Sequence, residues 1–88
     1  MLSLDLTRQA RDFLNQLDPK QFRQVVKKIL GLMEDPRPSD AQALKGYPFW
    51  RADIGEYRII YRMEGNCLKV VSVERRNDDE VYKKLSRM

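Results

Sequence analysis

The chain of 88 residues contains no histidine and only one cysteine, Cys67. Histidine is the side chain that most readily exchanges a proton near neutral pH and most often ligates metals. Its absence excludes histidine-based acid–base catalysis and histidine metal sites. A single cysteine excludes an intrachain disulfide and a cysteine metal cage. Because Cys67 lies in a predicted strand, we interpret it as a small apolar side chain rather than a nucleophile. Any reaction on a phosphate group would therefore depend on arginine, lysine and tyrosine.

Long apolar segments are also lacking. No stretch approaches the roughly 18 consecutive apolar residues of a membrane-spanning helix, and no signal peptide precedes the first predicted strand. We therefore expect a cytoplasmic protein that makes no contact with a membrane. The length fits one domain covering residues 1–88, with a small core. The net charge of +4 is a weak indication of a polyanionic partner.

Two amphipathic helices are predicted in the first 35 residues. Thr7 can cap the first helix, whose apolar residues recur at helical spacing: Ala10, Phe13, Leu14 and Leu17. The segment Asp18-Pro19-Lys20-Gln21 is typical of a second helix start, with a carboxylate cap and a proline in the first turn. The apolar stripe of this helix is Phe22, Val25, Val26, Ile29 and Met33, and the prolines of Asp35-Pro-Arg-Pro38 end it. The short connection predicts an antiparallel helix hairpin with one shared apolar face.

Alternating apolar and polar side chains predict strands on both sides of this helix pair. Residues 2–6 alternate in a short first strand. Residues 36–46 are interpreted as a loop, and three further strands follow it, separated by turns at Gly55-Glu56 and Glu64-Gly65-Asn66. Strands joined by turns this short are antiparallel neighbours. Asp78 or Asp79 can cap a last short helix around Tyr82.

The predicted fold is α+β: an N-terminal strand, an antiparallel helix hairpin packed on a twisted antiparallel sheet, and a short C-terminal helix. The period of two places one set of hairpin side chains toward the helices: Trp50, Ala52, Ile54, Tyr57, Ile59 and Tyr61. Trp50 and Tyr57 are therefore interpreted as core residues rather than RNA-stacking residues. The same period places Arg51, Asp53, Arg58 and Arg62 on the opposite, open face, which we expect to be basic.

Several arginines on or beside this open face can form an anion site. Arg51 and Arg58 lie on neighbouring predicted strands near one turn, so their side chains can approach the same point. Arg75 and Arg76 end the following strand. Together these guanidinium groups suit a phosphate and its developing charge. The alternative is a set of surface arginines paired with Glu56, Glu64 and Glu74.

Other charged and aromatic residues in the C-terminal half can be interpreted as ligand-binding or as structural. Tyr82 can stack a base or orient a phosphate, since aromatic faces commonly hold unpaired RNA bases, or it can pack on the sheet. Lys45 can contact a flanking phosphate or stay solvated. Asp78-Asp79-Glu80 does not predict a metal site, because negative charge is stabilising at a helix N-terminus and consecutive residues cannot all face one ion. We expect no metal and no cofactor, and RNA more than a small metabolite as the partner.

Four segments spread along the chain carry a family resemblance. They are Leu44-Lys-Gly46 with Pro48, Gly55-Glu-Tyr-Arg-Ile-Ile-Tyr61, Val71-Ser-Val73 with Arg75-Arg76, and Glu80-Val-Tyr82. With them the chain resembles the RelE-like toxins of bacterial toxin–antitoxin pairs, in the RelE/ParE superfamily. The resemblance covers nearly the whole chain, because the length and the helix hairpin with its proline stop match as well. The Tyr-Arg-Ile-Ile-Tyr piece does not separate RNA-cleaving members from gyrase-poisoning ones.

The resemblance implies a toxin that cuts messenger RNA in the ribosomal A site without a metal. In RelE-like toxins the 2′-hydroxyl attacks the adjacent phosphate, leaving a 2′,3′-cyclic phosphate and a 5′-hydroxyl. By position, the catalytic set would be Arg51, Arg58, Arg76 and Tyr82. Arg51 and Arg58 would handle the attacking hydroxyl and phosphate, Arg76 would serve the leaving oxygen, and Tyr82 would position the substrate. Apart from the resemblance, we predict that Lys45, Arg62 and Arg75 bind RNA. The expected partners are a RelB-like antitoxin, the ribosome and messenger RNA.

Asp53 departs from the family pattern, because RelE-like toxins often carry a second lysine at this place. Its carboxylate would weaken the local positive field, or it would pair with Arg51 or Arg58 and orient it. Arginine is a poor proton donor or acceptor, so charge stabilisation is its expected role. Two alternatives stay open: a ParE-like toxin that binds DNA gyrase and cleaves no RNA, and a basic RNA-binding module without turnover.

Overall fold

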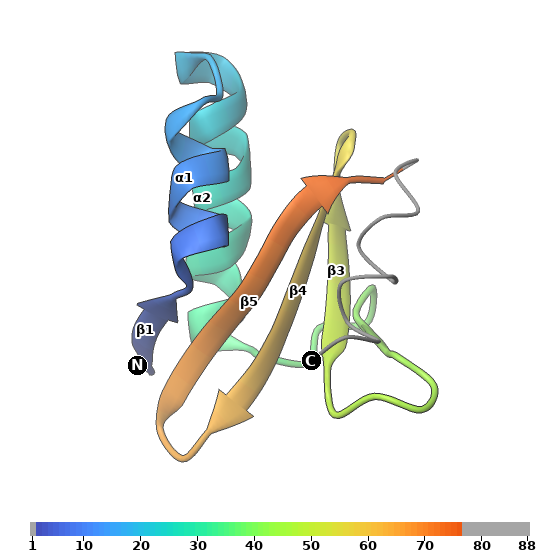
Figure 1. Cartoon of the computed structure of the whole chain (residues 1–88). Helices are drawn as coiled ribbons and strands as arrows, with labels where there is room; N and C mark the ends of the chain where they lie inside the picture. The colour runs from blue at the N-terminus through green and yellow to red at the C-terminus, as the bar shows by residue number, and fades with distance from the viewer. Residues whose placement is uncertain (1, 77–88) are drawn as a thin grey trace.

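The computed structural model describes residues 2–76, which form two helices and five strands (Figure 1). Their order is β1 (Ser3–Leu6), α1 (Arg8–Asn15), α2 (Pro19–Glu34), β2 (Gln42–Ala43), β3 (Trp50–Ile54), β4 (Tyr57–Glu64) and β5 (Cys67–Arg75). This architecture confirms the predicted α+β class. The predicted C-terminal helix, including Tyr82, lies outside the described residues. No helix within residues 2–76 is long and apolar enough to cross a membrane.

Both helices begin where the sequence predicts, each with a side-chain cap. The Thr7 hydroxyl accepts a hydrogen bond from the Ala10 N–H at 3.2 Å, and the Asp18 carboxylate accepts one from the Gln21 N–H at 2.8 Å. These bonds satisfy backbone donors that a helix leaves without partners in its first turn. α2 ends at Glu34, just before the two prolines, as predicted.

The apolar stripe of α2 is buried along part of its predicted length. Val25 and Ile29 are buried as expected, and Leu32 is buried in addition. Phe22, in the first turn of α2, keeps 38% of its surface exposed, so its predicted place in the core is wrong. The physical reason is the side of α2 on which Phe22 lies, because Phe22, Val26 and Leu30 follow one another at successive helical turns and line an open apolar groove together with Leu4 and Leu6.

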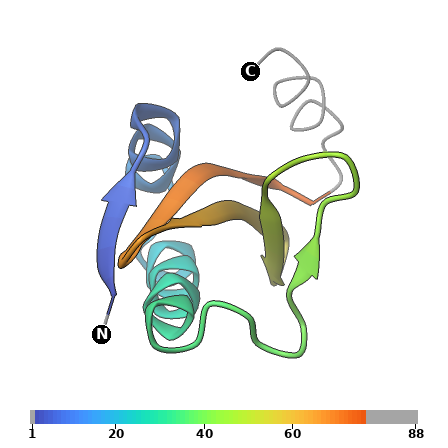
Figure 2. The ribbon, with the colours of Figure 1, turned by 90° about the horizontal axis from the view of Figure 1, so that it is seen from below.

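The five strands form one mixed sheet in the order β1-β5-β4-β3-β2. β3, β4 and β5 are antiparallel neighbours, as predicted, whereas β1 is parallel to β5. β2 lies inside residues 36–46, which the sequence analysis interprets as a loop. Figure 2 shows this segment running from the end of α2 to the edge of the sheet opposite β1. β2 is only two residues long, too short for an alternating pattern to reveal.

The turn between β3 and β4 requires a glycine. Gly55 has a φ angle of +56°, a conformation that residues with a Cβ atom rarely adopt. A Cβ atom there would also lie 2.8 Å from the side-chain amide nitrogen of Gln24. The resulting tight turn sets the register of the hairpin and places Asp53 directly opposite Arg58.

The helix-facing side of the sheet carries the main core. Ala52, Tyr57, Ile59 and Tyr61 are each at most 1% exposed and are packed with residues of both helices. Trp50 and Ile54 pack against this core while partly exposed. The predicted phase of the β3–β4 hairpin is therefore confirmed, including the core positions of Trp50 and Tyr57.

The open face of the sheet carries a second, smaller apolar cluster that the sequence analysis does not predict. Leu44 and Phe49, from the segment between β2 and β3, cover Ile60 and Val71. A register shift at Ile60 leaves Val71 as an extra residue of β5, as in a β-bulge. The open face therefore has an apolar centre, with charged side chains toward both ends of β4.

Tyr61 predicts a loss of stability at alkaline pH. Its hydroxyl donates a hydrogen bond to the Pro36 carbonyl at 2.5 Å, and burial raises the pKa of Tyr61 from 10.0 to about 12. Between these two values the folded protein keeps a proton that the unfolded chain loses, so the free energy of unfolding falls as pH rises. We expect Tyr61→Phe to flatten this fall, measured by urea unfolding at successive pH values. An equally steep fall in the variant would contradict this assignment.

Candidate functional site

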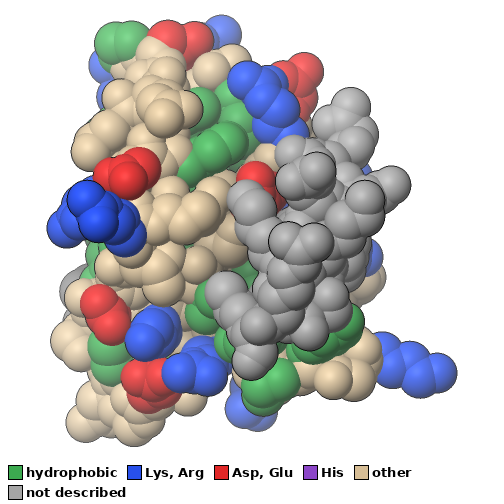
Figure 3. All heavy atoms as spheres, in the orientation of Figure 1, with side chains coloured by type: hydrophobic (Ala, Val, Ile, Leu, Met, Phe, Trp, Pro, Cys, Tyr) green, Lys and Arg blue, Asp and Glu red, His purple; other side chains and the backbone are tan. Residues whose placement is uncertain are grey.

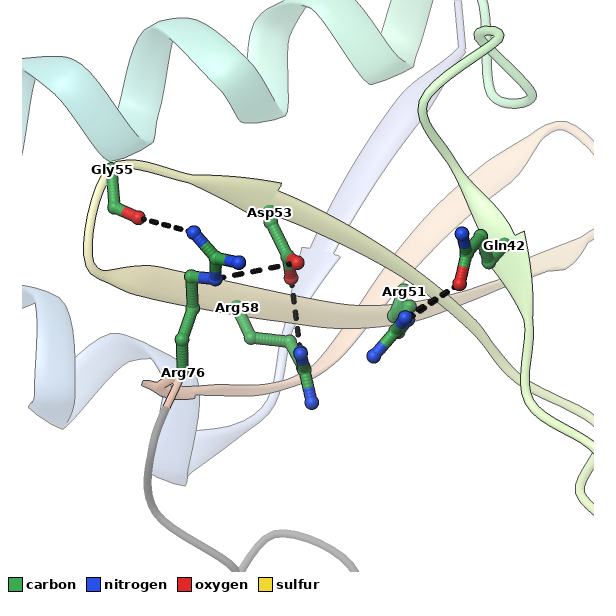
Figure 4. A network of polar contacts seen from close by, with 6 residues as sticks. All are labelled: Gln42, Arg51, Asp53, Gly55, Arg58 and Arg76. Atoms are coloured by element: carbon green, nitrogen blue, oxygen red, sulfur yellow. Dashed lines mark hydrogen bonds and ion pairs between the residues drawn. The ribbon is translucent and has the colours of Figure 1, made fainter.

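A carboxylate joins two of the predicted site arginines at the end of the sheet where β3 turns into β4 (Figure 4). Arg58 Nε donates a hydrogen bond to Asp53 Oδ1 at 2.9 Å, and Arg76 Nε lies 3.4 Å from Asp53 Oδ2. Arg58 and Arg76 come from β4 and from the residue after β5, so the sheet unites them across 18 positions of sequence. We name these three side chains the Asp53 cluster.

Arg58 is the more enclosed arginine of the Asp53 cluster. Its side chain is 11% exposed, compared with 53% for that of Arg76. On its other side, across the β4–β5 register, lies Glu74, which is only 5% exposed. Arg58 is therefore set between two carboxylates on neighbouring strands. Its guanidinium group is oriented by the fold before any ligand binds.

Glu74 is itself held in place from α1. Gln9 Nε2 donates hydrogen bonds to Glu74 Oε1 and to the Val73 carbonyl, both at 3.0 Å, and Gln9 Oε1 accepts one from the Val73 N–H at 3.1 Å. β1 pairs with β5 only as far as Val70, so Gln9 satisfies the backbone of β5 beyond the end of β1. The Ser72 hydroxyl also donates to Glu74 Oε1, at 3.2 Å. The helix layer thus fixes the carboxylate next to Arg58.

Arg76 is anchored to the β3–β4 turn. Its backbone N–H donates to the Glu56 carbonyl at 2.8 Å, and its Nη1 donates to the Gly55 carbonyl at 3.3 Å. A pocket of roughly 520 Å³ lies at this turn, lined by Gly55, Glu56, Arg58, Arg75 and Arg76. Because three of these five residues are arginines, the pocket favours an anionic group.

The other predicted site residues lie outside the Asp53 cluster. Arg51 is on the same face of the sheet, where its Nε and Nη2 donate to Gln42 Oε1 of β2 at 3.2 and 2.5 Å (Figure 4). The guanidinium group of Arg75 lies 5.8 Å from the centroid of the Tyr57 ring. Arg62 lies toward the opposite end of β4, and Lys45 is exposed in the segment after β2.

Basic and acidic side chains are mixed on the surface. On the face shown in Figure 3, Lys and Arg side chains alternate with Asp and Glu side chains. On the open face of the sheet, Asp53 and Glu74 flank Arg58. This face therefore carries charges of both signs, whereas the sequence analysis expects a basic face. Within residues 2–76 no three acidic or cysteine side chains gather where they could hold a metal ion.

Two residues of the site, Gln9 and Gln42, are not identified from the sequence, whereas Glu74 is named there as a partner of surface arginines. Glu74 has a recognisable signal, because it follows directly on the apolar strand segment 70–73, and a buried carboxylate there needs polar partners. Gln9 and Gln42 have no such signal in the sequence. Gln9 hydrogen-bonds the backbone of β5 beyond the end of β1, and Gln42 lies in the two-residue strand β2, and both arrangements exist only in the folded chain. The pairing of Asp53 with Arg58 is one of the two outcomes predicted for that carboxylate.

Toxins of toxin–antitoxin systems share this fold. The isolated E. coli RelE toxin matches with a TM-score of 0.77 and 24% identity, over 99% of this chain and 97% of that chain. The intact E. coli RelBE complex matches with a TM-score of 0.76 and 20% identity, over 89% and 100% of the two chains. A chain of the chromosomal ParDE system of P. aeruginosa gives 0.71 and 16%, over 85% and 96%. At these identities the similarity establishes the fold.

Sequence comparison identifies the family. A search of curated proteins finds no match, whereas the family described as "ParE toxin of type II toxin-antitoxin system, parDE" matches residues 4–80. The matched range includes the whole Asp53 cluster and both helices. The chain therefore belongs to the ParE toxin family and is a toxin of the RelE/ParE superfamily of type II toxin–antitoxin pairs.

Proposed function

We propose that this toxin is a ribosome-dependent endoribonuclease that cleaves messenger RNA in the A site. The Asp53 cluster is the observation that carries this proposal. Arg58 is oriented by carboxylates on both neighbouring strands and lines, with Arg76, a pocket suited to an anion. A donor fixed in this way stabilises developing charge on a phosphate without having to reorganise during the reaction.

In the proposed reaction, the 2′-oxygen of one nucleotide bonds to the adjacent phosphorus while the bond to the 5′-oxygen of the next nucleotide breaks. Arg58 would bind the phosphate, Arg51 would lie on the side of the attacking hydroxyl, and Arg76 would stabilise the leaving oxygen. Tyr82 would position the substrate. Arginine stays protonated near neutral pH, so we propose that the ribosomal A site assists the transfer of the 2′-proton.

A cognate antitoxin is the proposed protein partner. The E. coli RelBE structure contains a toxin of this fold together with its antitoxin, and the family of this chain is defined by toxin–antitoxin pairs. We propose a RelB-like antitoxin that covers the arginine-lined pocket and thereby keeps RNA away from it.

Asp53 favours a second function, that of a ParE-like toxin which inhibits DNA gyrase and cleaves no RNA. Its carboxylate contacts both Arg58 and Arg76 and reduces their positive field. The fold does not decide between the two, because the TM-score of 0.71 for the ParDE chain is close to the 0.76 for the RelBE complex.

Mapping messenger RNA 5′ ends in bacteria that express the toxin separates these functions. For a ribonuclease we expect new 5′-hydroxyl ends inside translated frames, and we expect Arg76→Ala to remove them. Arg76 is the suitable residue because its half-exposed side chain can be truncated with little effect on the core. Growth arrest without such ends, together with altered DNA supercoiling, would support gyrase inhibition instead.

A further inference from the structure

A second pocket lies on the open face, toward the opposite end of β4 from the Asp53 cluster. Its volume is roughly 480 Å³, and its lining combines aromatic and basic side chains, among them Tyr47, Phe49, Arg62 and Lys69. None of these residues belongs to the arginine-lined pocket at the β3–β4 turn. We name this second site the Arg62 pocket.

The Arg62 pocket brings two cations side by side. Arg62 and Lys69 are directly opposite each other in the β4–β5 register, and like charges in this arrangement repel. Lys69 Nζ lies 3.9 Å from Asp5 Oδ2 and Arg62 Nη2 pairs with Glu64, and the carboxylates of both pairs are about half exposed. Exposed pairs of this kind are weak. An anion bound between the two cations would relieve the repulsion.

Arg62 also has an unused hydrogen-bond donor. Its Nε is buried and has no hydrogen-bond partner, although buried donors are normally paired. The guanidinium group lies 5.7 Å from the centroid of the Phe49 ring, which limits how it can turn. Tyr47 lines the same pocket and is only partly buried, so its ring can contact a ligand. Cations beside an accessible aromatic ring are the combination that holds single-stranded nucleic acid.

The distance between the Arg62 pocket and the Asp53 cluster is one that a single RNA strand can span. Arg62 follows Arg58 by four residues on β4 and points to the same face, so the two lie about 13 Å apart along the strand. A stacked strand of nucleic acid advances about 3.4 Å for each nucleotide. A single RNA strand can therefore reach both sites with a few nucleotides between them.

We propose that the Arg62 pocket binds a nucleotide a few positions away from the cleaved phosphate, with its phosphate on Arg62 and Lys69 and its base against Tyr47. This inference rests on the proposed function, because it takes the ligand to be single-stranded RNA. The pocket contributes to the affinity for longer RNA and does not take part in the chemical step.

The test measures binding of the purified full chain to 2′-O-methyl RNA, which cannot be cleaved, by fluorescence anisotropy. We expect Arg62→Gln/Lys69→Gln to weaken binding of a nine-nucleotide RNA by about tenfold or more and to change binding of a trinucleotide less than about twofold. Tyr47→Ala should weaken the longer complex by about tenfold. Glu64→Gln should tighten it, because it removes the carboxylate that competes for Arg62.

The matched control is Lys20→Gln/Lys27→Gln, which removes the same charge from exposed positions of α2. Unchanged affinity of the first double variant for the longer RNA would overturn the proposal, and so would an equal loss in the control. Loss of antitoxin binding with unchanged RNA affinity would assign the pocket to the protein partner and also overturn it. The binding test measures no cleavage, so its outcome is separate from that of the 5′-end mapping. If no new 5′ ends form in cells, the proposed ribonuclease function fails, while the binding test still reports whether the Arg62 pocket holds RNA.

Discussion

The Arg58→Gln/Arg76→Gln variant is expected to lose RNA cleavage by at least about 10²–10³-fold, the usual effect of removing one fixed donor to a developing charge. Both guanidinium groups contact Asp53 and line the same pocket, so the variant removes two of the three arginine charges at the proposed phosphate site. Glutamine is the suitable replacement, because its side-chain amide can still donate a hydrogen bond to Asp53. The carboxylate of Asp53 is then not left without a partner. The measurement is toxin-dependent cleavage of messenger RNA on purified ribosomes.

The control for this variant is Arg8→Gln/Arg23→Gln, which removes two exposed arginines from the helices. It has the same net charge as the site variant, so a general loss of attraction to RNA would lower cleavage equally in both. We expect the control to keep most of the activity. Full growth arrest by the folded site variant would show that neither arginine is needed and would refute the assignment.

Replacing Glu74 by alanine is expected to lower the free energy of unfolding by about 2–4 kcal/mol, as is typical when one partner of a buried polar network is removed. Glu74 is 5% exposed and accepts hydrogen bonds from Gln9 and Ser72. Its loss also removes the carboxylate that faces Arg58 across the sheet. Urea unfolding followed by circular dichroism would report the change as a lower midpoint.

Glu56→Ala is the matched control for the Glu74 prediction. Glu56 lies in the neighbouring turn, lines the same pocket as Arg58 and is exposed. Surface substitutions of this kind change stability by within about 0.5 kcal/mol. If both variants unfold at the wild-type midpoint, the network from Gln9 to Arg58 does not contribute to the stability of the fold.

These two experiments separate two roles of one charged network. The pair Arg58 and Arg76 faces the pocket, and its removal is expected to affect chemistry more than stability. Glu74 is buried beside Arg58 and is held by Gln9 of α1, and its removal is expected to affect stability first and the orientation of Arg58 as a consequence. A loss of cleavage by Glu74→Ala at temperatures where it stays folded would indicate that this orientation matters.

Much of the fold follows from short-range patterns. Thr7 and Asp18 cap the two helices as their positions predict, because a cap depends only on residues within one turn. The alternation from Trp50 to Tyr61 predicts the faces of the β3–β4 hairpin, because the period of a strand is a local property. Phe22 is a failure of the same reasoning, since the helical period does not show which part of a wide apolar stripe faces the sheet and which part lines an open groove.

The sequence predicts only some of the contacts at the candidate site. Family resemblance and strand position both point to Arg58 and Arg76, and the structure brings these two side chains together on Asp53. The pairing of Asp53 with Arg58 is one of the predicted outcomes, whereas the contact of Arg76 with Asp53 and the hydrogen bonds of Arg51 to Gln42 are not predicted. The second apolar cluster was also missed, because Leu44 and Phe49 lie in an irregular segment without a period.

The sequence by itself determines the elements of this protein, their faces and its membership of a toxin family, because capping, periodicity and motif spacing act over a few residues. Only the tertiary structure decides how the charged residues of these elements meet. Asp53 and Arg76 are far apart in sequence, and their contact depends on the register of β3, β4 and β5 and on the turn at Gly55. The same register places Arg62 beside Lys69, since cross-strand neighbours are set by strand pairing and not by any local pattern.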